Sequence, residues 1–180
     1  MKNGQAFFYY MKDAECDYVS NMKSSEIIKL LNLKPLPLEG GYYCETFRSE
    51  IESGQKNRRT GTCIYYLLEG KNKSYWHSVK SDEIWLYHCG SPGIQILLFA
   101  GGRWEERIIG ADFAGNEFPQ SIIPAGTWQA AVLKNPDSWG LFSAVVCPGF
   151  EFEDYIPGKG ADLVKNWPMA EKRIRQLGLI

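Results

Sequence analysis

Residues 83–109 read EIWLYHCGSPGIQILLFAGGRWEERII, and this stretch decides the fold class. It contains three runs of β-branched and aromatic residues, at 83–88, 94–99 and 103–109. Glycine-rich breaks, Gly90-Ser91-Pro92-Gly93 and Ala100-Gly101-Gly102, separate them. Such runs are typical of strands, and a short glycine turn between two of them predicts a β-hairpin. The segment therefore predicts successive antiparallel strands rather than strands alternating with helices.

The same pattern continues outward on both sides. Residues 62–68, 121–124 and 140–146 are further strand candidates, spaced without intervening helices. This spacing predicts an all-β barrel or sandwich. Short helices are expected only at the ends, over 24–31 and, in two pieces, over 161–166 and 168–177.

Composition limits the class of protein. The chain has 180 residues, 44% hydrophobic and 23% charged, which is ordinary for a globular domain. We expect one domain over 24–180, preceded by an extension over 1–23 that is disordered or swapped. Twenty basic and 21 acidic residues give a net charge of −1, which argues against nucleic acid as a partner.

The termini and the cysteines predict the compartment. No signal peptide and no apolar run of membrane-spanning length is evident, so we expect a cytoplasmic protein without a membrane partner. The five cysteines form no Cys-x-x-Cys pair, which favours free thiols over a zinc or redox site.

The chemically informative residues centre on one of the two histidines. His77 is followed by Glu83 and Gly90, and downstream by Pro124 and Gly126. In this order and spacing the segments resemble the two motifs of the cupins, G-x5-H-x-H-x3-E-x6-G and P-x-G-x-x-H. The resemblance implies a double-stranded β-helix, the cupin jelly-roll barrel, with short N- and C-terminal helices.

Two of the metal-ligand positions that the resemblance implies are substituted. The second histidine of the first motif falls on Val79, and that of the second motif on Gln129. Because transition metals need three or four good ligands, we expect no cofactor. A divalent metal at His77, Glu83 and Gln129 remains the alternative, with low affinity.

A second resemblance covers about residues 25–167. The segments EGGYYCETFR at 39–48, SDEIW at 81–85, PAGTWQ at 124–129 and CPGFEF at 147–152 are similar to the signatures of one uncharacterised, single-domain cupin branch. Pro37 stands where that branch often carries a histidine. The branch resembles sugar-nucleotide epimerases in fold and forms homodimers, so the resemblance implies a homodimer that binds a small polar ligand.

Alternation along the strands suggests which side chains face the barrel interior. Glu83, Trp85 and Tyr87 share one face of their strand, and Gln129 is the inward member of the pair after the Pro-Ala-Gly turn. The candidate ligand contacts are polar or aromatic residues. Five come from the signature segments, Tyr42, Glu45, Arg48, Trp85 and Gln129, and the sixth is Tyr75, which lies two residues before His77.

These residues support two functions of different classes, and a third function ranks below them. The first is an isomerase or epimerase acting on a sugar phosphate or nucleotide-linked sugar, with His77 as base, Glu83 as its orienting carboxylate and Tyr87 as acid. The second is a non-catalytic module that binds a small ligand with the same residues. A metal-dependent dioxygenase ranks third because of the substituted ligand positions.

Each candidate residue also has a structural interpretation. His77 could be a hydrogen-bonded core histidine, and Trp85 and Tyr87 could fill the barrel. Arg48 could pair with Glu45 as a structural link. His88, at a strand end, is expected to lie at the surface. The pair Arg58-Arg59 is expected in a solvated loop.

Overall fold

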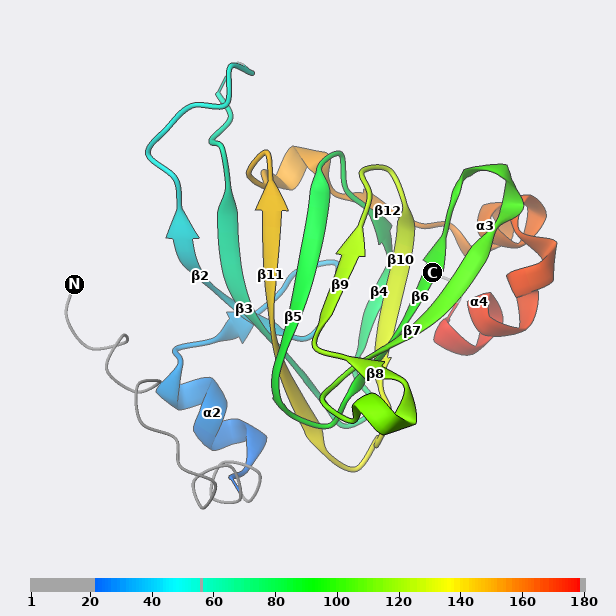
Figure 1. The fold of residues 1–180 in the computed structure, drawn as a ribbon, viewed down its shortest axis with the longest axis horizontal. Helices are drawn as coiled ribbons and strands as arrows, with labels where there is room; N and C mark the ends of the chain where they lie inside the picture. The colour runs from blue at the N-terminus through cyan, green and yellow to red at the C-terminus, as the bar shows by residue number, and fades with distance from the viewer. Residues whose placement is uncertain (1–21, 56, 179–180) are drawn as a thin grey trace.

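The computed structural model describes residues 22–55 and 57–178, which form two β-sheets packed face to face (Figure 1). The strands of the first sheet are, in spatial order, β1 (Lys34–Pro35), β2 (Tyr42–Arg48), β3 (Thr62–Glu69), β11 (Trp139–Cys147), β5 (Asp82–Gly90) and β9 (Gln120–Ile123). Those of the second sheet are β12 (Ile156–Pro157), β4 (Lys73–Ser78), β10 (Trp128–Leu133), β6 (Gly93–Leu98), β7 (Trp104–Ile109) and β8 (Glu117–Phe118).

Neighbouring strands pair antiparallel in both sheets, apart from the short parallel pair of β7 and β8. The chain repeatedly changes from one sheet to the other, since β3, β5 and β11 lie in one sheet while β4, β6 and β10 lie in the other. This arrangement confirms the predicted all-β jelly roll. The predicted hairpin of β6 and β7 is also confirmed: Leu98 pairs with Trp104, and Gly101 and Gly102 take φ of 78° and 83° in the turn.

The space between the sheets is filled by a hydrophobic core. Tyr66 and Trp85, whose ring centroids lie 5.3 Å apart, are each 1% exposed at its centre. Aliphatic side chains from both sheets surround them: Leu68, Leu97, Ile109, Ile123 and Leu133. Burial of this apolar surface is the main term that holds the two sheets together.

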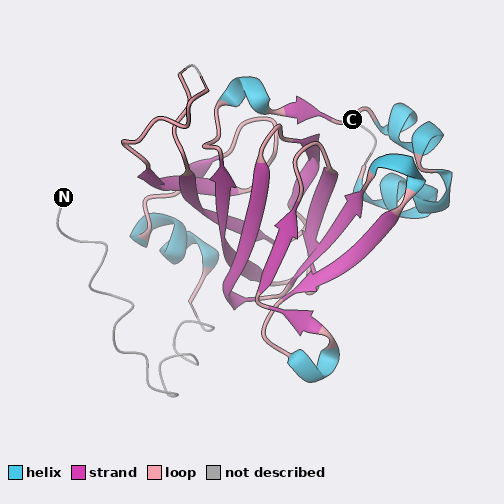
Figure 2. Cartoon of the chain, turned by 45° about the horizontal axis from the view of Figure 1, so that its top comes forward, coloured by secondary structure: helices cyan, strands magenta, loops and turns pink. Residues whose placement is uncertain are grey.

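The outer face of the second sheet is covered by the C-terminal helices α3 (Gly160–Asn166) and α4 (Glu171–Leu177), joined by the 3-10 turn Pro168–Ala170 (Figure 2). The predicted two-piece C-terminal helix is thereby confirmed. Trp76 of β4 packs beneath these helices, and its indole donates to the Ile174 carbonyl oxygen at 3.4 Å. β4 was not among the predicted strands.

The packing of α4 leads to a first prediction. Ile174 is fully buried, so Ile174→Val removes one methylene group from a closed site and should lower the free energy of unfolding by about 1 kcal/mol. Lys172→Ala, on the exposed side of the same helix, should change it by less than about 0.5 kcal/mol. Equilibrium urea unfolding measures both. Equal effects of the two changes would show that α4 is not packed on the sheet.

At the opposite side, α2 (Ser24–Leu30) lies against the first sheet. Glu26 closes its first turn by accepting from the Lys23 backbone N–H at 2.7 Å. Ile27 is buried on the sheet, but Leu30 is 56% exposed, so the predicted apolar face is narrower than the sequence suggests. The predicted extension over 1–23 lies outside the described residues, apart from its last two.

No helix of residues 22–55 or 57–178 has both the length and the apolar character needed to cross a membrane.

Candidate functional site

A cavity of about 310 Å³ opens between the two sheets. Most of its wall comes from the first sheet, and β4 contributes from the second. Its lining residues are Leu36, Glu39, Tyr43, Glu45, Arg48, Thr62, Ile64, His77, Val79, Glu83, Ala144, Val146, Phe150, Glu151 and Phe152. Apolar side chains alternate with acidic ones, which is typical of a site that orients a small polar molecule.

His77 lies on this wall with its ring held in one orientation. Its Nδ1 atom is 2.7 Å from the Tyr75 carbonyl oxygen, and since a carbonyl can only accept, Nδ1 is the donor. The ring stacks on Tyr155 with centroids 5.1 Å apart and planes 18° apart. Nε2 then remains the atom directed at the acidic groups, 3.8 Å from Glu39 Oε2. Neutral His77 therefore has its basic nitrogen at the cavity.

Glu39 reaches the site from the Glu-Gly-Gly turn that precedes β2. Gly40 has φ of +91°, and a Cβ atom there would lie 2.4 Å from the Lys73 carbonyl oxygen, so the turn packs directly on the β4 backbone. The Tyr75 N–H donates to the Glu39 carbonyl at 2.8 Å and fixes the turn. The Glu39 side chain accepts from Ser74 Oγ at 2.9 Å. The turn thus explains why this segment needs two glycines after a glutamate.

Glu83 is the deepest carboxyl group of the cavity and is 8% exposed. Its Oε2 accepts from Gln129 Nε2 at 2.5 Å, a contact that joins β5 of one sheet to β10 of the other. Burial, and after it the charge of Glu39, raise the pKa of Glu83 to about 7, although His77, Gln129 and Trp85 act in the opposite direction. Glu83 can therefore hold or release a proton near neutral pH.

The cavity mouth is closed on one side by Arg48. Its guanidinium binds Glu45 through Nε at 3.0 Å and Nη2 at 2.8 Å, and Glu151 through Nη1 at 2.6 Å. Nη2 also donates to the Phe150 carbonyl at 3.2 Å. The structural role considered for Arg48 is thus present, and it links β2 to a segment about a hundred residues further along the chain.

The structure brings together five of the nine residues proposed from sequence: His77, Glu83, Gln129, Glu45 and Arg48. Tyr75 lies outside the cavity and is 37% exposed. The cause is a β-bulge: Gln129 pairs with His77 and Ala131 with Ser74, so two residues of β4 oppose only one of β10. The extra residue shifts the alternation, and Ser74 rather than Tyr75 shares the inward face with His77.

Tyr42, a predicted ligand contact, does not line the cavity. It packs on the other side of β2, against the cluster beneath α2, and its neighbour Tyr43 lines the cavity instead. A second bulge, between Glu45 and Phe47, then shifts the alternation of β2 by one residue. Glu45 and Arg48 consequently face the cavity together, although three positions separate them.

Trp85 and Tyr87 belong to the core rather than to the cavity wall. Trp85 packs between Tyr66 and Phe142. The Tyr87 hydroxyl donates to the Gly90 carbonyl at 2.6 Å, at the far end of β5 from Glu83. Tyr87 is therefore not placed to act as the acid in the site, and the barrel-filling interpretation holds for both rings.

Three cavity residues were not predicted, although all of them lie in the quoted signature segments: Glu39, Tyr43 and Glu151. The two glycines that follow Glu39 were the available signal. His88, predicted at the surface, is partly buried, with Nε2 2.6 Å from Ser143 Oγ. Burial lowers the pKa of His88.

The residues present do not fit a cupin metal centre. The four implied ligand positions hold His77, Val79, Glu83 and Gln129, of which Val79 has no donor atom and Gln129 uses its amide N–H₂ on Glu83. Among the described residues, no three His, Cys, Asp or Glu side chains are grouped in a way that could hold a metal ion. The donor set is too small for a transition metal, which prefers three or four protein ligands.

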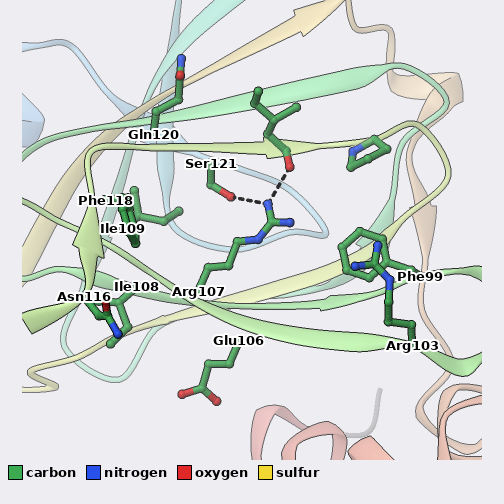
Figure 3. A pocket seen from close by; sticks show the side chains of 12 residues that line it. Phe99, Arg103, Glu106, Arg107, Ile108, Ile109, Asn116, Phe118, Gln120 and Ser121 are labelled. Carbon is green, nitrogen blue, oxygen red and sulfur yellow. Dashed lines mark hydrogen bonds between the residues drawn. The ribbon is translucent and has the colours of Figure 1, made fainter. Parts of the chain in front are cut away.

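A second hollow, of about 840 Å³, lies between β7 and β9 (Figure 3). Arg107 points across it and donates to Ser121 Oγ at 3.1 Å and to the Ile122 carbonyl at 2.7 Å. Arg103 lies over the Phe99 ring, with Cζ 3.8 Å from the centroid. Both guanidiniums are also paired with Glu105.

Comparison with known proteins gives the family. Residues 25–156 match the family model described as cupin superfamily (DUF985). The uncharacterized protein YML079W of Saccharomyces cerevisiae is 33% identical over 151 residues, which cover 74% of this chain and 75% of the yeast protein.

Solved structures agree with this assignment. Protein SO0799 from Shewanella oneidensis superposes with a TM-score of 0.81 at 27% identity, covering 87% of this chain and 98% of that one. A hypothetical protein from Leishmania major gives 0.79 at 28% identity, covering 88% and 100%. A cupin-2 domain from Rhodospirillum rubrum, at 15% identity and a TM-score of 0.51, shares the fold. With a matching family model, a relative of this similarity and the jelly roll itself, the chain belongs to the DUF985 family of the cupin superfamily.

Proposed function

We propose that the cavity at His77 binds a small polar molecule and catalyses proton transfer on it, as an isomerase or epimerase does. One observation carries the proposal: His77 and the Glu83 carboxyl line the same cavity, and burial, followed by the charge of Glu39, raises the pKa of Glu83 to about 7. A general base and a general acid near neutral pH are the two groups that such a reaction needs.

The roles follow from the hydrogen bonds. Nδ1 of His77 is committed to the Tyr75 carbonyl, so Nε2 takes the proton from the carbon next to a substrate carbonyl. The electron pair of the broken C–H bond forms a C=C bond, and the carbonyl oxygen takes a proton from the Glu83 carboxyl. When the first carbon carries a hydroxyl group, the imidazolium returns its proton to the former carbonyl carbon while the Glu83 carboxylate takes the proton of that hydroxyl, whose carbon becomes the new carbonyl, and this completes an isomerisation. Return of the proton to the opposite face of the first carbon, with the enol proton going back to Glu83, gives an epimerisation. Glu39, 3.8 Å from Nε2, stabilises the imidazolium that forms.

The orienting group for His77 differs from the one expected from sequence. The Tyr75 carbonyl and the stacked Tyr155 ring hold the imidazole, which leaves Glu83 available as the acid. Glu83 thereby takes over the part first considered for Tyr87.

Deuterium exchange tests the proposal across a set of small compounds, so the natural substrate need not be identified first. C3–C6 aldoses, ketoses and hydroxy acids would be incubated with the protein in D₂O, and loss of the exchangeable C–H signal followed by ¹H NMR. We expect at least one compound to exchange, and His77→Gln to slow that exchange by about 100-fold or more. His88→Gln, the change of the other histidine, should leave the rate within about twofold.

The second candidate is a binding module without catalysis. It is favoured by the Gln129–Glu83 hydrogen bond, which gives the deepest carboxyl group a structural partner. Saturation-transfer NMR on the same compounds distinguishes the two candidates. Binding with no deuterium incorporation in any compound would support the module and contradict proton transfer.

A further inference from the structure

Acidic side chains outnumber basic ones in the cavity wall. Four carboxyl groups line it, from Glu39, Glu45, Glu83 and Glu151, whereas Arg48 is its one guanidinium. A cleft lined by groups of one sign raises the local concentration of ligands of the opposite sign and lowers that of like-charged ligands. The cavity wall is therefore unfavourable for an anion before any specific contact is considered.

Arg48 does not offset this imbalance, because its donors are already in use. The guanidinium presents its planar fork to Glu45 and uses the remaining Nη1 on Glu151. Phosphate or carboxylate recognition by arginine needs that same bidentate fork. An incoming phosphate would have to displace both carboxylates from the guanidinium.

One buried donor near the carboxyl groups suits an uncharged ligand. The Tyr155 hydroxyl, whose ring stacks on His77, has no hydrogen-bond partner within the described part of the chain. Burial, and after it the charge of Glu39, raise the pKa of Tyr155, which keeps that hydroxyl protonated. Buried donors without partners are rare in native structures and commonly indicate a ligand or water oxygen.

We propose that the cavity selects small polar molecules that are neutral or positively charged, such as unphosphorylated aldoses, ketoses and their amino derivatives, and excludes phosphorylated and carboxylated ones. The proposal rests on the cavity being the ligand site of the proposed function, and it narrows the substrate class of that site. It also replaces the sugar phosphate or nucleotide-linked sugar that the epimerase resemblance implies. The carboxylates accept hydrogen bonds from hydroxyl or ammonium groups, while apolar residues such as Ile64 and Val146 contact the carbon skeleton.

The charge preference can be measured with reagents that differ only in charge. Val79 lines the cavity and is 6% exposed, so Val79→Cys places a thiol inside it. The full-length variant would be treated with three methanethiosulfonates that carry a trimethylammonium, a sulfonate or only a methyl group. Trypsin cuts after Lys73 and Lys80, so the peptide 74–80 reports residue 79 separately from the native cysteines.

We measure how fast Val79→Cys reacts with each reagent, relative to the rate of free cysteine with the same reagent. We expect this relative rate to be about tenfold or more higher for the trimethylammonium reagent than for the sulfonate reagent. The relative rate of the methyl reagent should lie between the two. Combining Val79→Cys with Glu39→Gln and Glu151→Gln should reduce the ratio severalfold, and added salt should reduce it as well. Ile64→Cys in a Cys63→Ser background, at a second position in the wall, repeats the measurement on the peptide 60–71 if the first variant does not fold.

The outcomes separate this proposal from the proposed function. A normalised ratio at or below one would overturn the charge selection and leave proton transfer intact. A clear cation preference in a protein that exchanges no deuterium would support the selection and contradict the catalysis. Failure of all three reagents at both positions would show that the cavity admits no small molecule, which overturns both.

Discussion

Arg58→Ala is expected to lower the free energy of unfolding by about 3 kcal/mol, because it leaves a buried carboxylate without its partner. Both oxygens of Asp154 accept from the two terminal nitrogens of Arg58, one at 2.8 Å. The Asp154 side chain is 3% exposed, and its other cation, Lys80, is 3.8 Å away and mostly solvated. We take the low end of the range for buried pairs because Lys80 and water at the surface relieve part of the loss.

Equilibrium urea unfolding at pH 7 measures this effect, and the adjacent arginine provides the control. The Arg59 side chain donates to the Glu50 carbonyl at the surface, at 2.7 Å, so Arg59→Ala should cost less than about 0.5 kcal/mol. Arg58 lowers the pKa of Asp154, so the stabilisation is present above the ordinary aspartate pKa and is lost as pH falls through the lowered value. Equal effects of the two changes at pH 7 would contradict the buried pair.

The pair also corrects the view of Arg58 as part of a solvated loop. Arg58 donates to the Gly149 carbonyl at 3.0 Å as well, and Asp154 accepts from the Glu151 N–H at 3.3 Å. Arg58 thereby holds the segment that carries Glu151 at the cavity mouth and Tyr155 beneath His77. We expect its loss to loosen the ligand site in addition to destabilising the fold.

Glu83→Gln is expected to stabilise the protein at alkaline pH and to change little at pH 5. The pKa of Glu83 is raised from 4.5 to about 7 in the folded protein, so folding favours its protonated form. The stability that comes from protonated Glu83 is therefore fully present below pH 4.5 and is lost as the pH rises through 7. The shift corresponds to about 3 kcal/mol in the free energy of unfolding. The wild type loses this stability at alkaline pH, whereas the glutamine variant, which does not ionise, keeps it.

Urea unfolding at pH 5 and pH 8 tests this linkage. Glutamine has the shape of a protonated glutamate and its oxygen can still accept from Gln129, so the variant should fold. Glu50→Gln changes an exposed carboxylate and should leave the stability–pH profile parallel to that of the wild type. If the Glu83→Gln profile were also parallel, Glu83 would ionise in the folded protein as it does in the unfolded chain, and it could not serve as the acid.

Most of the fold was predictable because its signals are local. The runs at 62–68, 94–99 and 140–146 are strands, and the turn at Gly101-Gly102 joins a hairpin as expected. The broken C-terminal helix begins and ends close to the predicted residues. Strand propensity, alternation and turn residues act over a few positions, so the sequence contains them in readable form.

The site was predictable in part. His77, Glu83 and Gln129 were found through motif spacing, and all three line or border the cavity; Glu45 and Arg48 were taken from the signature segment, and both line it. Tyr42 and Tyr75 were assigned by proximity in sequence, and both face away from it. For these two, side-chain direction depends on the exact strand face, which a signature does not report.

By itself, the sequence determined the all-β class, the terminal helices and the substitution of Val79 and Gln129 at implied metal positions. The tertiary structure alone decided which side chains meet. A bulge in β4 needs two residues to face one on β10, so it depends on the partner strand and turns Tyr75 outward. Likewise, Arg48 meets Glu151 across 103 positions, and Glu83 acquires its raised pKa from burial between two sheets. The ion pair and the raised pKa both need residues that are far apart in the sequence to come close together, which happens only when the sheets pack.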